Sequence, residues 1–342
     1  MKIGVVGATG AVGREMLEDL GESALEHCEV LAFATPQSEG EHLTFRGKTV
    51  VVKAYNLDAA RSCDYILMSA GKDFSLVHSP AICKNGGPTV IDNSSAWRMD
   101  PKIPLVVPEV NSGVLDNFKG GIIANPNCAM IQLAVSLKPL RDAFGLELVQ
   151  VSTYQSVSGT GLKGIKELSQ QLSAYFKFET AQPAVYEHPI GFNIIPYIGP
   201  LDTNGHCDEE VKLIQELKKV FSDEELNVLA TTTRVPVFNC HCEAVTVKLK
   251  TPVTRDKARE VLEDFEPIEF FPDSVRLEFP TPRTIVGRKG VFLCRLRVMN
   301  GRRSSKWLQF WNVADNLKKG AATNAVQILE YLVENKGSHQ TK

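Results

Sequence analysis

The 342-residue sequence lacks the long apolar runs of membrane proteins and the basic excess of nucleic-acid-binding proteins. No apolar stretch approaches the roughly 18 residues that a membrane-spanning helix requires. Lys and Arg together number 38 against 40 Asp and Glu, which gives a formal net charge of −2. This balance leaves no surplus positive charge for nucleic-acid phosphates or anionic lipids. We therefore expect no nucleic-acid partner and no membrane association.

Cysteine is also sparse, with eight residues spread over the whole chain. Such scattered residues do not build a disulfide framework. The segment Cys240-His241-Cys242 lacks the second, paired motif of a zinc site, which argues against a bound metal. The first residues enter a predicted strand without the layout of a signal peptide. We predict reduced thiols in a cytoplasmic protein that binds no metal.

The rest of the composition is that of a globular protein, with 43% hydrophobic and 23% charged residues. A chain of this length can form two domains that each bury a core. Short apolar segments alternate with helical patterns, and we predict strands at residues 3–6, 30–34, 65–69, 89–92, 105–107 and 122–124. Strands separated by helices favour an α/β fold with a Rossmann-like, doubly wound parallel sheet.

The pattern changes after residue 127. Longer strands are predicted at 148–157, 244–250, 291–298 and 307–313, and helices at 129–144, 162–176, 208–221, 255–265 and 316–334. The pair Asn300-Gly301 predicts a hairpin turn, and the chain from residue 335 is predicted to be disordered. Alternating strands with helices between them predict an α+β domain with a largely antiparallel sheet.

A glycine turn follows the first predicted strand. Gly7, Gly10 and Gly13 are spaced by three residues and precede a helical pattern. This context is typical of a dinucleotide-binding turn, in which the pyrophosphate lies on the helix N-terminus. The second predicted strand ends at Thr35-Pro36-Gln37-Ser38, which has neither the acidic residue typical of NAD sites nor the arginine typical of NADP sites. These residues alone leave the choice of cofactor open.

Cys128 is the strongest candidate for a catalytic residue. The segment Asn125-Pro126-Asn127 ends a predicted strand, and Asn127 fits the N-cap of the next helix. Cys128 then lies in the first turn, where the helix dipole favours a thiolate and free backbone N–H groups can bind an oxyanion. These features favour a nucleophile over the alternative, a buried structural cysteine.

A cysteine nucleophile needs an acid or base and groups that hold the acyl substrate. Among the seven histidines, His241 lies just ahead of a predicted strand, where a structural role is the usual alternative. Glu209 and Lys212 are three residues apart in a predicted helix and share a face. Their alternative interpretation is a surface ion pair.

An ordered set of motifs extends over nearly the whole chain. They are residues 7–13 (GATGAVG), 92–98 (DNSSAWR), 125–128 (NPNC), 155–159 (QSVSG), 192–196 (FNIIP), 209–212 (EEVK), 234 with 241, and 314–320 (ADNLKKG). With these motifs in this order, the sequence resembles the aspartate-semialdehyde dehydrogenases.

The resemblance implies the reductive dephosphorylation of L-4-aspartyl phosphate to L-aspartate 4-semialdehyde with NADPH, a step toward lysine, threonine and methionine. It implies that Cys128 forms a thioester and that His241 is the acid/base. Asn127 would help to stabilise the oxyanion, and Gln155 would orient the acyl group.

The resemblance also implies how the substrate and the cofactor are held. Arg234 would bind the α-carboxylate, Glu209 the ammonium group, and Arg98 and Lys212 the phosphate. The implied cofactor contacts are Gly7, Thr9, Gly10, Ala11, Val12, Thr35, Gln37, Ser38, Ser158, Gly159 and Asn316. Gln37 departs from the arginine that the family commonly has for the 2′-phosphate of NADP. We expect NADP as the cofactor, with NAD as the alternative.

The resemblance further implies a domain organisation and an assembly. Residues 1–127 with 314–342 would form the dinucleotide-binding domain, and residues 128–313 a catalytic and dimerisation domain. A small-molecule substrate and a homodimer or homotetramer are expected.

Two other functions remain as alternatives. An N-acetyl-glutamyl-phosphate reductase typically has glycine in place of Asn127 and must hold an acetylated amine, whereas Glu209 suits a free ammonium group. A non-catalytic nucleotide-binding redox sensor would use Cys128 as its reactive thiol without the substrate contacts.

Overall fold

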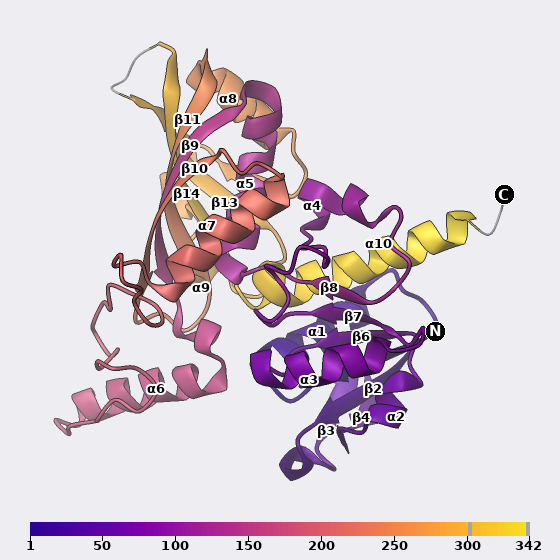
Figure 1. The fold of residues 1–342 in the computed structure, drawn as a ribbon. Helices are drawn as coiled ribbons and strands as arrows, with labels where there is room; N and C mark the ends of the chain where they lie inside the picture. The colour runs from indigo at the N-terminus through magenta and orange to yellow at the C-terminus, as the bar shows by residue number, and fades with distance from the viewer. Residues whose placement is uncertain (300–302, 340–342) are drawn as a thin grey trace. The chain divides into compact units, whose positions relative to one another are not determined.

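The computed structural model describes residues 1–299 and 303–339, and the chain divides into two compact units (Figure 1). Unit 1 contains Met1–Asn127 together with the chain from Ala321 onward, and unit 2 contains Cys128–Gly320. Each unit has its own six-stranded sheet. Among the described residues, no helix is both long and apolar enough to cross a membrane.

Unit 1 alternates strands with helices. Its elements are β1 (Lys2–Val6), α1 (Ala11–Glu22), β2 (Glu29–Ala34), η1 (Pro36–Ser38), β3 (His42–Phe45), β4 (Lys48–Val51), β5 (Lys53–Ala54), α2 (Leu57–Arg61), β6 (Tyr65–Met68), α3 (Lys72–Cys83), β7 (Thr89–Asp92), α4 (Pro108–Asn111), η2 (Ser112–Leu115), β8 (Ile122–Ala124) and α10 (Thr323–His339).

The large sheet of unit 1 has the strand order β5-β2-β1-β6-β7-β8, and all of its neighbouring strands are parallel. The predicted doubly wound parallel sheet is confirmed. Strand β1 lies between β2 and β6, so the order of the strands reverses beside it. Ligands of such sheets bind at the carboxyl ends of the strands at this reversal, where the glycine turn follows β1.

Alternate side chains of β1 supply the cores on the two faces of this sheet. Ile3 and Val5 belong to the same buried cluster as Leu329 of α10. Val6 belongs to a second cluster with Ile82 of α3. Successive side chains of a strand point to opposite faces, so helices cover both faces of the sheet.

The strand predicted at residues 105–107 does not form, and this prediction is wrong. Leu105 makes only an isolated bridge to Ala124. The side chain of Asn111 accepts a hydrogen bond from the backbone N–H of Val107 and donates one to the carbonyl of Leu105, both at 2.9 Å. An amide side chain thus replaces part of the strand ladder, and Pro108 begins α4 directly afterwards.

Unit 2 contains the longer strands. Its elements are α5 (Cys128–Phe144), β9 (Leu146–Gln155), η3 (Val157–Thr160), α6 (Leu162–Phe176), α7 (Asp208–Phe221), β10 (Asn227–Arg234), β11 (His241–Val253), α8 (Arg255–Glu263), β12 (Ile268–Phe271), η4 (Asp273–Glu278), α9 (Pro282–Ile285), β13 (Val291–Val298), β14 (Ser305–Ala314) and the π-helical turn η6 (Lys318–Ala322), which reaches the boundary with unit 1.

The sheet of unit 2 has the order β10-β9-β11-β14-β13-β12. Its three central pairs are antiparallel and its two outer pairs are parallel, so the prediction of a largely antiparallel sheet is confirmed. Helices α5, α7 and α8 pack together on this sheet. Leu229 points to the opposite side and is 55% exposed, and Tyr154 lies on that side beside Trp311, with ring centres 5.3 Å apart.

The last helix differs from its predicted bounds of 316–334. The turn η6 precedes it, and α10 runs from Thr323 to His339, so disorder from residue 335 is not observed in the backbone up to His339. The hairpin predicted at Asn300-Gly301 lies outside the described residues.

The glycine turn of unit 1 is packed backbone against backbone, which makes it sensitive to substitution. A Cβ at Gly13 would lie 2.1 Å from the carbonyl oxygen of Gly7. We expect Gly13→Ala to lower the free energy of unfolding by about 1–3 kcal/mol and to weaken cofactor binding. Urea denaturation and cofactor titration measure these effects. Gly113→Ala, whose added Cβ would approach nothing closer than 3.8 Å, is the control. Equal stability of the two variants would contradict the close packing of the turn.

Candidate active site

The predicted nucleophile and the predicted acid/base are in contact. Cys128 is the first residue of α5, and His241 is the first residue of β11. The Sγ atom of Cys128 lies 3.2 Å from Nε2 of His241. Helix α5 packs on β11, a central strand of the sheet, and this packing brings together two residues that are far apart in the sequence.

The imidazole of His241 is fixed from its other side by Ser156. The backbone N–H of Ser156 donates to Nδ1 at 3.1 Å. Burial and, secondarily, the positive charge of Arg234 lower the pKa of the imidazole to about 3, so the ring is neutral near pH 7. A nitrogen that accepts a hydrogen bond carries no proton, and the single proton therefore lies on Nε2. This proton faces the sulfur of Cys128.

Asn316 holds the segments on both sides of this ring. Its Oδ1 accepts hydrogen bonds from the backbone N–H of Cys240 at 2.9 Å and from Oγ of Ser156 at 3.1 Å. Its Nδ2 donates to Oγ of Ser158 at 2.9 Å. Cys240 has a φ of 71°, in the left-handed region, immediately before His241. Asn316 and Ser158 thus join η3 to the start of β11, and their implied cofactor contacts stay predictions.

Gln155 and Arg234 end two neighbouring parallel strands and are paired in register. Arg234 is buried, and its Nη1 donates to the backbone carbonyl of Ser156 at 2.6 Å. The Nε2 atom of Gln155 is buried without a hydrogen-bond partner among the described residues. An unpaired buried donor is unfavourable, so this amide is suited to bind an oxygen of a ligand.

A cavity of about 360 Å³ adjoins Arg234. Tyr186, Tyr197 and Thr160 contribute to its lining, and the guanidinium carbon of Arg234 lies 5.9 Å from the centre of the Tyr186 ring. The cavity is large enough for a ligand the size of an amino acid. A guanidinium in its wall provides the fork that binds a carboxylate with two hydrogen bonds.

Two glycines let the backbone approach the predicted catalytic pair, Cys128 and His241. A Cβ at Gly159 would lie 3.2 Å from Nη1 of Arg234 and 3.4 Å from Nε2 of His241. A Cβ at Gly320, in the π-helical turn η6, would lie 3.0 Å from the Cβ of Cys128. Any side chain at either position would crowd the residues of the proposed reaction.

Helix α7 presents Glu209 and Lys212 on one face, as their spacing predicts. The Nζ atom of Lys212 lies 3.8 Å from Oε2 of Glu209 and 2.5 Å from Oδ2 of Asp208. Lys212 is thus shared between two carboxylates. Binding of a phosphate by Lys212 would replace one of these ion pairs.

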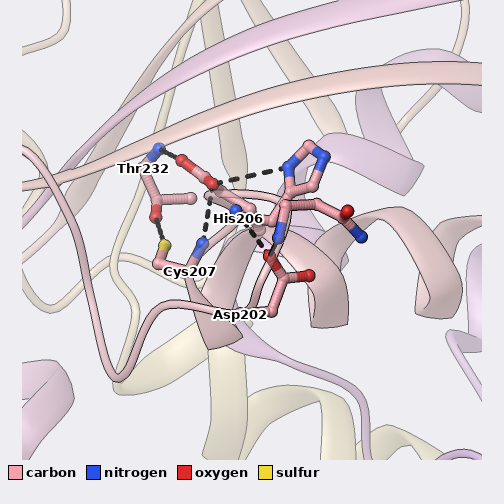
Figure 2. A network of polar contacts seen from close by, with 6 residues as sticks. Asp202, His206, Cys207 and Thr232 are labelled. Carbon is pink, nitrogen blue, oxygen red and sulfur yellow. Dashed lines mark hydrogen bonds and ion pairs between the residues drawn. The ribbon is translucent and has the colours of Figure 1, made fainter.

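Asp202, His206, Cys207 and Thr232 belong to a network of polar contacts (Figure 2). This network holds the N-terminus of α7 and includes the buried carboxylate of Glu210. This carboxylate accepts the backbone N–H groups of Cys207 and Thr232, both at 3.0 Å, and lies 3.8 Å from Nδ1 of His206. The Sγ of Cys207 contacts Oγ1 of Thr232 at 3.0 Å, and Asp202 accepts the backbone N–H of His206 at 2.9 Å. Glu210 therefore ties α7 to β10, the strand that ends at the predicted carboxylate-binding arginine.

The glycine turn in unit 1 fits a dinucleotide pyrophosphate. Gly7 has a φ of 84°, and a Cβ there would lie 2.3 Å from the carbonyl oxygen of Ser69. Gly10 occupies the N-cap of α1, and no side chain caps this helix. The backbone N–H groups at the start of α1, where Ala11 and Val12 lie, are therefore suited to bind an anion.

The end of β2 carries the residues that would face the ribose. Thr35 and Gln37 are exposed, and Oγ of Ser38 lies 3.5 Å from Oγ1 of Thr9. Arg14 of α1 donates from Nε to the carbonyl of Thr9 at 3.1 Å. A cation therefore lies in this region although Gln37 replaces the expected arginine.

Arg98 and Asn127 are both buried in unit 1. Arg98 donates to the carbonyl of Asn125 at 3.0 Å and to that of Asn93 at 2.9 Å, which links the segments after β8 and β7. Asn127 immediately precedes α5 in the chain. Their contacts with substrate stay predictions.

The other cysteines do not form a second reactive centre. All eight are free thiols. Burial raises the pKa of Cys242 to about 12 and that of Cys240 further, which keeps both thiols neutral. Among the residues whose side chains the structure describes, no three metal-ligating side chains gather in a group that could hold an ion.

Comparisons with known proteins extend over the whole chain. A family model described as semialdehyde dehydrogenase, NAD binding domain, matches residues 2–118, and one described as semialdehyde dehydrogenase, dimerisation domain, matches residues 137–319. An aspartate-semialdehyde dehydrogenase of Aquifex aeolicus is 43% identical over 336 residues, which are 97% of this chain and 98% of that protein. The chain belongs to the aspartate-semialdehyde dehydrogenase family.

Further relatives agree with this assignment. The aspartate-semialdehyde dehydrogenase of Bacillus subtilis is 38% identical over 97% of each chain. A crystal structure of aspartate semialdehyde dehydrogenase II from Vibrio cholerae, complexed with ASA, has a TM-score of 0.92 at 40% identity and covers 97% of this chain and 98% of that one. Unit 1 thus contains the nucleotide-binding domain of the family, and unit 2 contains its dimerisation domain.

Sequence reasoning assigned no role to several residues of this aspartate-semialdehyde dehydrogenase fold. Ser156 was part of a motif, but nothing in the sequence indicates that its backbone N–H fixes His241. Gly320 also belongs to one of the motifs, but the sequence does not indicate that it lies against Cys128. Arg14 could have been noticed as a cation in the first turn of the helix after the glycines.

The Glu210 network predicts a stability effect. In Glu210→Ala, the buried N–H groups of Cys207 and Thr232 lose their acceptor, and we expect the free energy of unfolding to fall by about 2 kcal/mol. Urea denaturation measures this change. Glu225→Ala, at an exposed position, is the control and should shift stability by less than about 0.5 kcal/mol. A similar stability for both variants would show that the network does not anchor α7.

Proposed function

We propose that the protein reduces L-4-aspartyl phosphate to L-aspartate 4-semialdehyde with NADPH and releases phosphate. The contact that carries this proposal is the 3.2 Å approach of the Cys128 sulfur to Nε2 of His241 at the start of a helix. Gln155 lies at the end of β9, directly before Ser156, whose backbone N–H fixes His241. The buried amide of Gln155 has no hydrogen-bond partner among the described residues, which supports binding of an acyl oxygen there.

In the proposed reaction, the thiolate of Cys128 attacks the acyl carbon and forms a tetrahedral oxyanion. The backbone N–H groups at the start of α5 and the side chain of Asn127 stabilise this oxyanion. Its collapse breaks the carbon–oxygen bond to phosphate and leaves a thioester on the sulfur. A bound nicotinamide cofactor would supply the hydride for the reduction of this thioester. The resulting adduct releases the aldehyde and regenerates the thiolate.

His241 acts through the single proton on its Nε2. The Nε2–H group can donate a hydrogen bond to the thiolate before attack and to the oxyanion of each adduct afterwards, and the neutral ring keeps its proton throughout. Because the imidazole is neutral near pH 7, the site does not rely on a preformed thiolate–imidazolium pair.

The substrate contacts follow from charge. Arg234 adjoins the cavity and would bind the α-carboxylate, while Glu209 would bind the ammonium group. Arg98 and Lys212 would bind the phosphate. The proposed assembly is a homodimer or homotetramer, in which a second copy of the chain covers the exposed sheet face around Leu229.

The reaction is tested by oxidation of aspartate semialdehyde with NADP in the presence and absence of phosphate. We expect turnover only with phosphate and little activity on N-acetylglutamate semialdehyde. Cys128→Ala should abolish turnover and leave cofactor binding unchanged, because the glycine turn is untouched. Cys28→Ala is the control and should keep full activity. Turnover by the Cys128→Ala variant would contradict the mechanism.

NADP is the proposed cofactor because Arg14 lies beside Thr9 and can reach toward a 2′-phosphate. Arg14→Gln should weaken NADPH binding about tenfold and leave NADH binding unchanged. Nicotinamide fluorescence titration measures both affinities. Lys48→Gln, at an exposed position of unit 1, is the control. Equal effects of Arg14→Gln on NADPH and NADH would remove Arg14 from 2′-phosphate recognition.

A further inference from the structure

A sealed cluster of polar side chains lies next to the catalytic pair within unit 2. We define the Glu243 cluster as Gln132 and Ser136 of α5, Glu243 of β11 and Asn312 of β14, all of which are fully buried. Glu243 is two residues after His241 on β11, so both side chains point to the same face of the sheet.

The cluster follows the catalytic residues along both elements. Gln132 and Ser136 succeed Cys128 at steps of four residues along α5, so all three lie on one stripe of the helix. Asn312 is paired in register with Glu243 across the antiparallel strands. Two polar rows, one on α5 and one on the sheet, therefore run side by side away from the sulfur and the imidazole.

Hydrogen bonds connect this cluster to His241. The Nε2 atom of Gln132 donates to the backbone carbonyl of His241 at 3.4 Å. The side-chain amide of Gln132 is also near enough to the carboxyl group of Glu243 to lower its pKa. The Nδ2 atom of Asn312 donates to Oε2 of Glu243 at 2.8 Å. Gln132 thus lies beside the carboxyl group of Glu243 and is hydrogen-bonded to the backbone of His241.

The buried acceptors of the cluster outnumber the donors available to them. The hydroxyl of Thr153, which also has no hydrogen-bond partner among the described residues, can donate to only one of the following atoms. Oε1 of Glu243, Oε1 of Gln132 and Oδ1 of Asn312 are buried and have no hydrogen-bond partner among the described residues. All three are acceptors when Glu243 is ionised. A proton on Oε1 of Glu243 converts one of them into a donor, which an amide oxygen of the cluster can accept.

The surroundings contain no charge that would favour the ionised form. Burial raises the pKa of Glu243 to about 8, against smaller lowering effects of its hydrogen bonds to Gln132 and Asn312. No lysine, arginine or histidine among the described residues forms an ion pair with it. A carboxylate here would be a buried charge without a counter-ion.

The titratable groups around Glu243 are few. On its own strand these are His241, which is neutral, and Cys242, a neutral thiol on the opposite face. Strand β9 places Thr153 in register with it. On α5, the stripe that carries Gln132 and Ser136 has one titratable group, Cys128, which lies at the start of the helix beside His241. The charged residues Lys138 and Asp142 of that helix pair with each other.

We propose that Glu243 is a positioning residue that keeps its carboxyl group protonated and, through Gln132, holds the backbone of His241 in place for the thiol chemistry of Cys128. The kinetic part of this inference rests on the proposed function. When Glu243 ionises at alkaline pH, its proton passes to solvent and a negative charge enters the sealed cluster. Gln132 then lies between a carboxylate and a carbonyl, and the support of His241 weakens.

The protonation state can be measured without turnover. Protein labelled with ¹³C at the glutamate carboxyl groups should show one glutamate that titrates near pH 8, and this signal should be missing in Glu243→Gln. Infrared difference spectra of the same pair should show a protonated carboxylic acid at neutral pH. A carboxylate at position 243 near pH 6 would overturn the proposal, whatever reaction the protein catalyses.

Stability provides a second measurement. The folded-state pKa lies above the unfolded value of about 4.3, so the stabilising effect of the proton is lost as pH rises from about 4 through 8. Relative to Glu243→Gln, the wild-type Tm should therefore fall over this range. A Tm difference that is constant with pH would contradict a protonated Glu243 in the folded protein.

The kinetic consequence is tested by the pH dependence of kcat. Glu243→Gln should keep kcat within about threefold at neutral pH and keep activity at alkaline pH where the wild type loses it, with KM little changed. Glu147→Gln, whose carboxylate pairs with Lys248 at the surface, is the control and should show the wild-type profile. Identical alkaline profiles for wild type and Glu243→Gln would contradict the positioning role. Lack of activity in the wild type would count against the proposed function and leave the spectroscopic result intact.

Discussion

The proposed chemistry of this protein depends on an imidazole that is held from both sides. The backbone N–H of Ser156 lies 3.1 Å from Nδ1 of His241, and the sulfur of Cys128 lies 3.2 Å from Nε2. Because a backbone N–H cannot accept a proton, the first contact fixes which nitrogen of the neutral ring carries the proton. The second contact aims that proton at the nucleophile. Asn316 in turn accepts hydrogen bonds from the side chain of Ser156 and from the backbone N–H of Cys240. The positions of Cys128 and His241 therefore depend on contacts among separate segments of unit 2.

The sheet of unit 2 explains why these segments meet. Strands β10 and β9 are parallel and end in register at Arg234 and Gln155. Strand β11 is antiparallel to β9, so its first residue, His241, lies beside the end of β9. Three adjacent strands therefore deliver a guanidinium, an amide and an imidazole to one edge of the sheet. Helix α5 packs on the same strands and begins at Cys128. Positions set by a sheet are more rigid than positions set by loops, which suits a reaction that needs accurate alignment.

Local signals in the sequence predicted the parts of this arrangement that depend on a few neighbouring residues. The glycine turn after β1 and the start of a helix at Cys128 follow from turn and helix-start chemistry, and the two sheet types follow from the spacing of apolar segments. Long-range features could not be predicted in this way. The side chain of Asn111 replaces the expected strand ladder at Leu105, and a backbone group of Ser156 selects the tautomer of His241. No local signal in the sequence marks Glu243 as buried, because its burial depends on the packing of β14 and α5 around it. The family resemblance supplied roles for residues such as Glu209, whose local pattern alone fits a surface ion pair.

Mass spectrometry tests most directly whether the sulfur of Cys128 is the atom that becomes acylated. Protein mixed with aspartate semialdehyde and oxidised cofactor in the absence of phosphate should accumulate an aspartyl thioester, which proteolysis would locate on the peptide that contains Cys128. Addition of phosphate should remove the adduct. An adduct on another cysteine, or oxidation of the aldehyde with no covalent adduct at any time, would contradict the account.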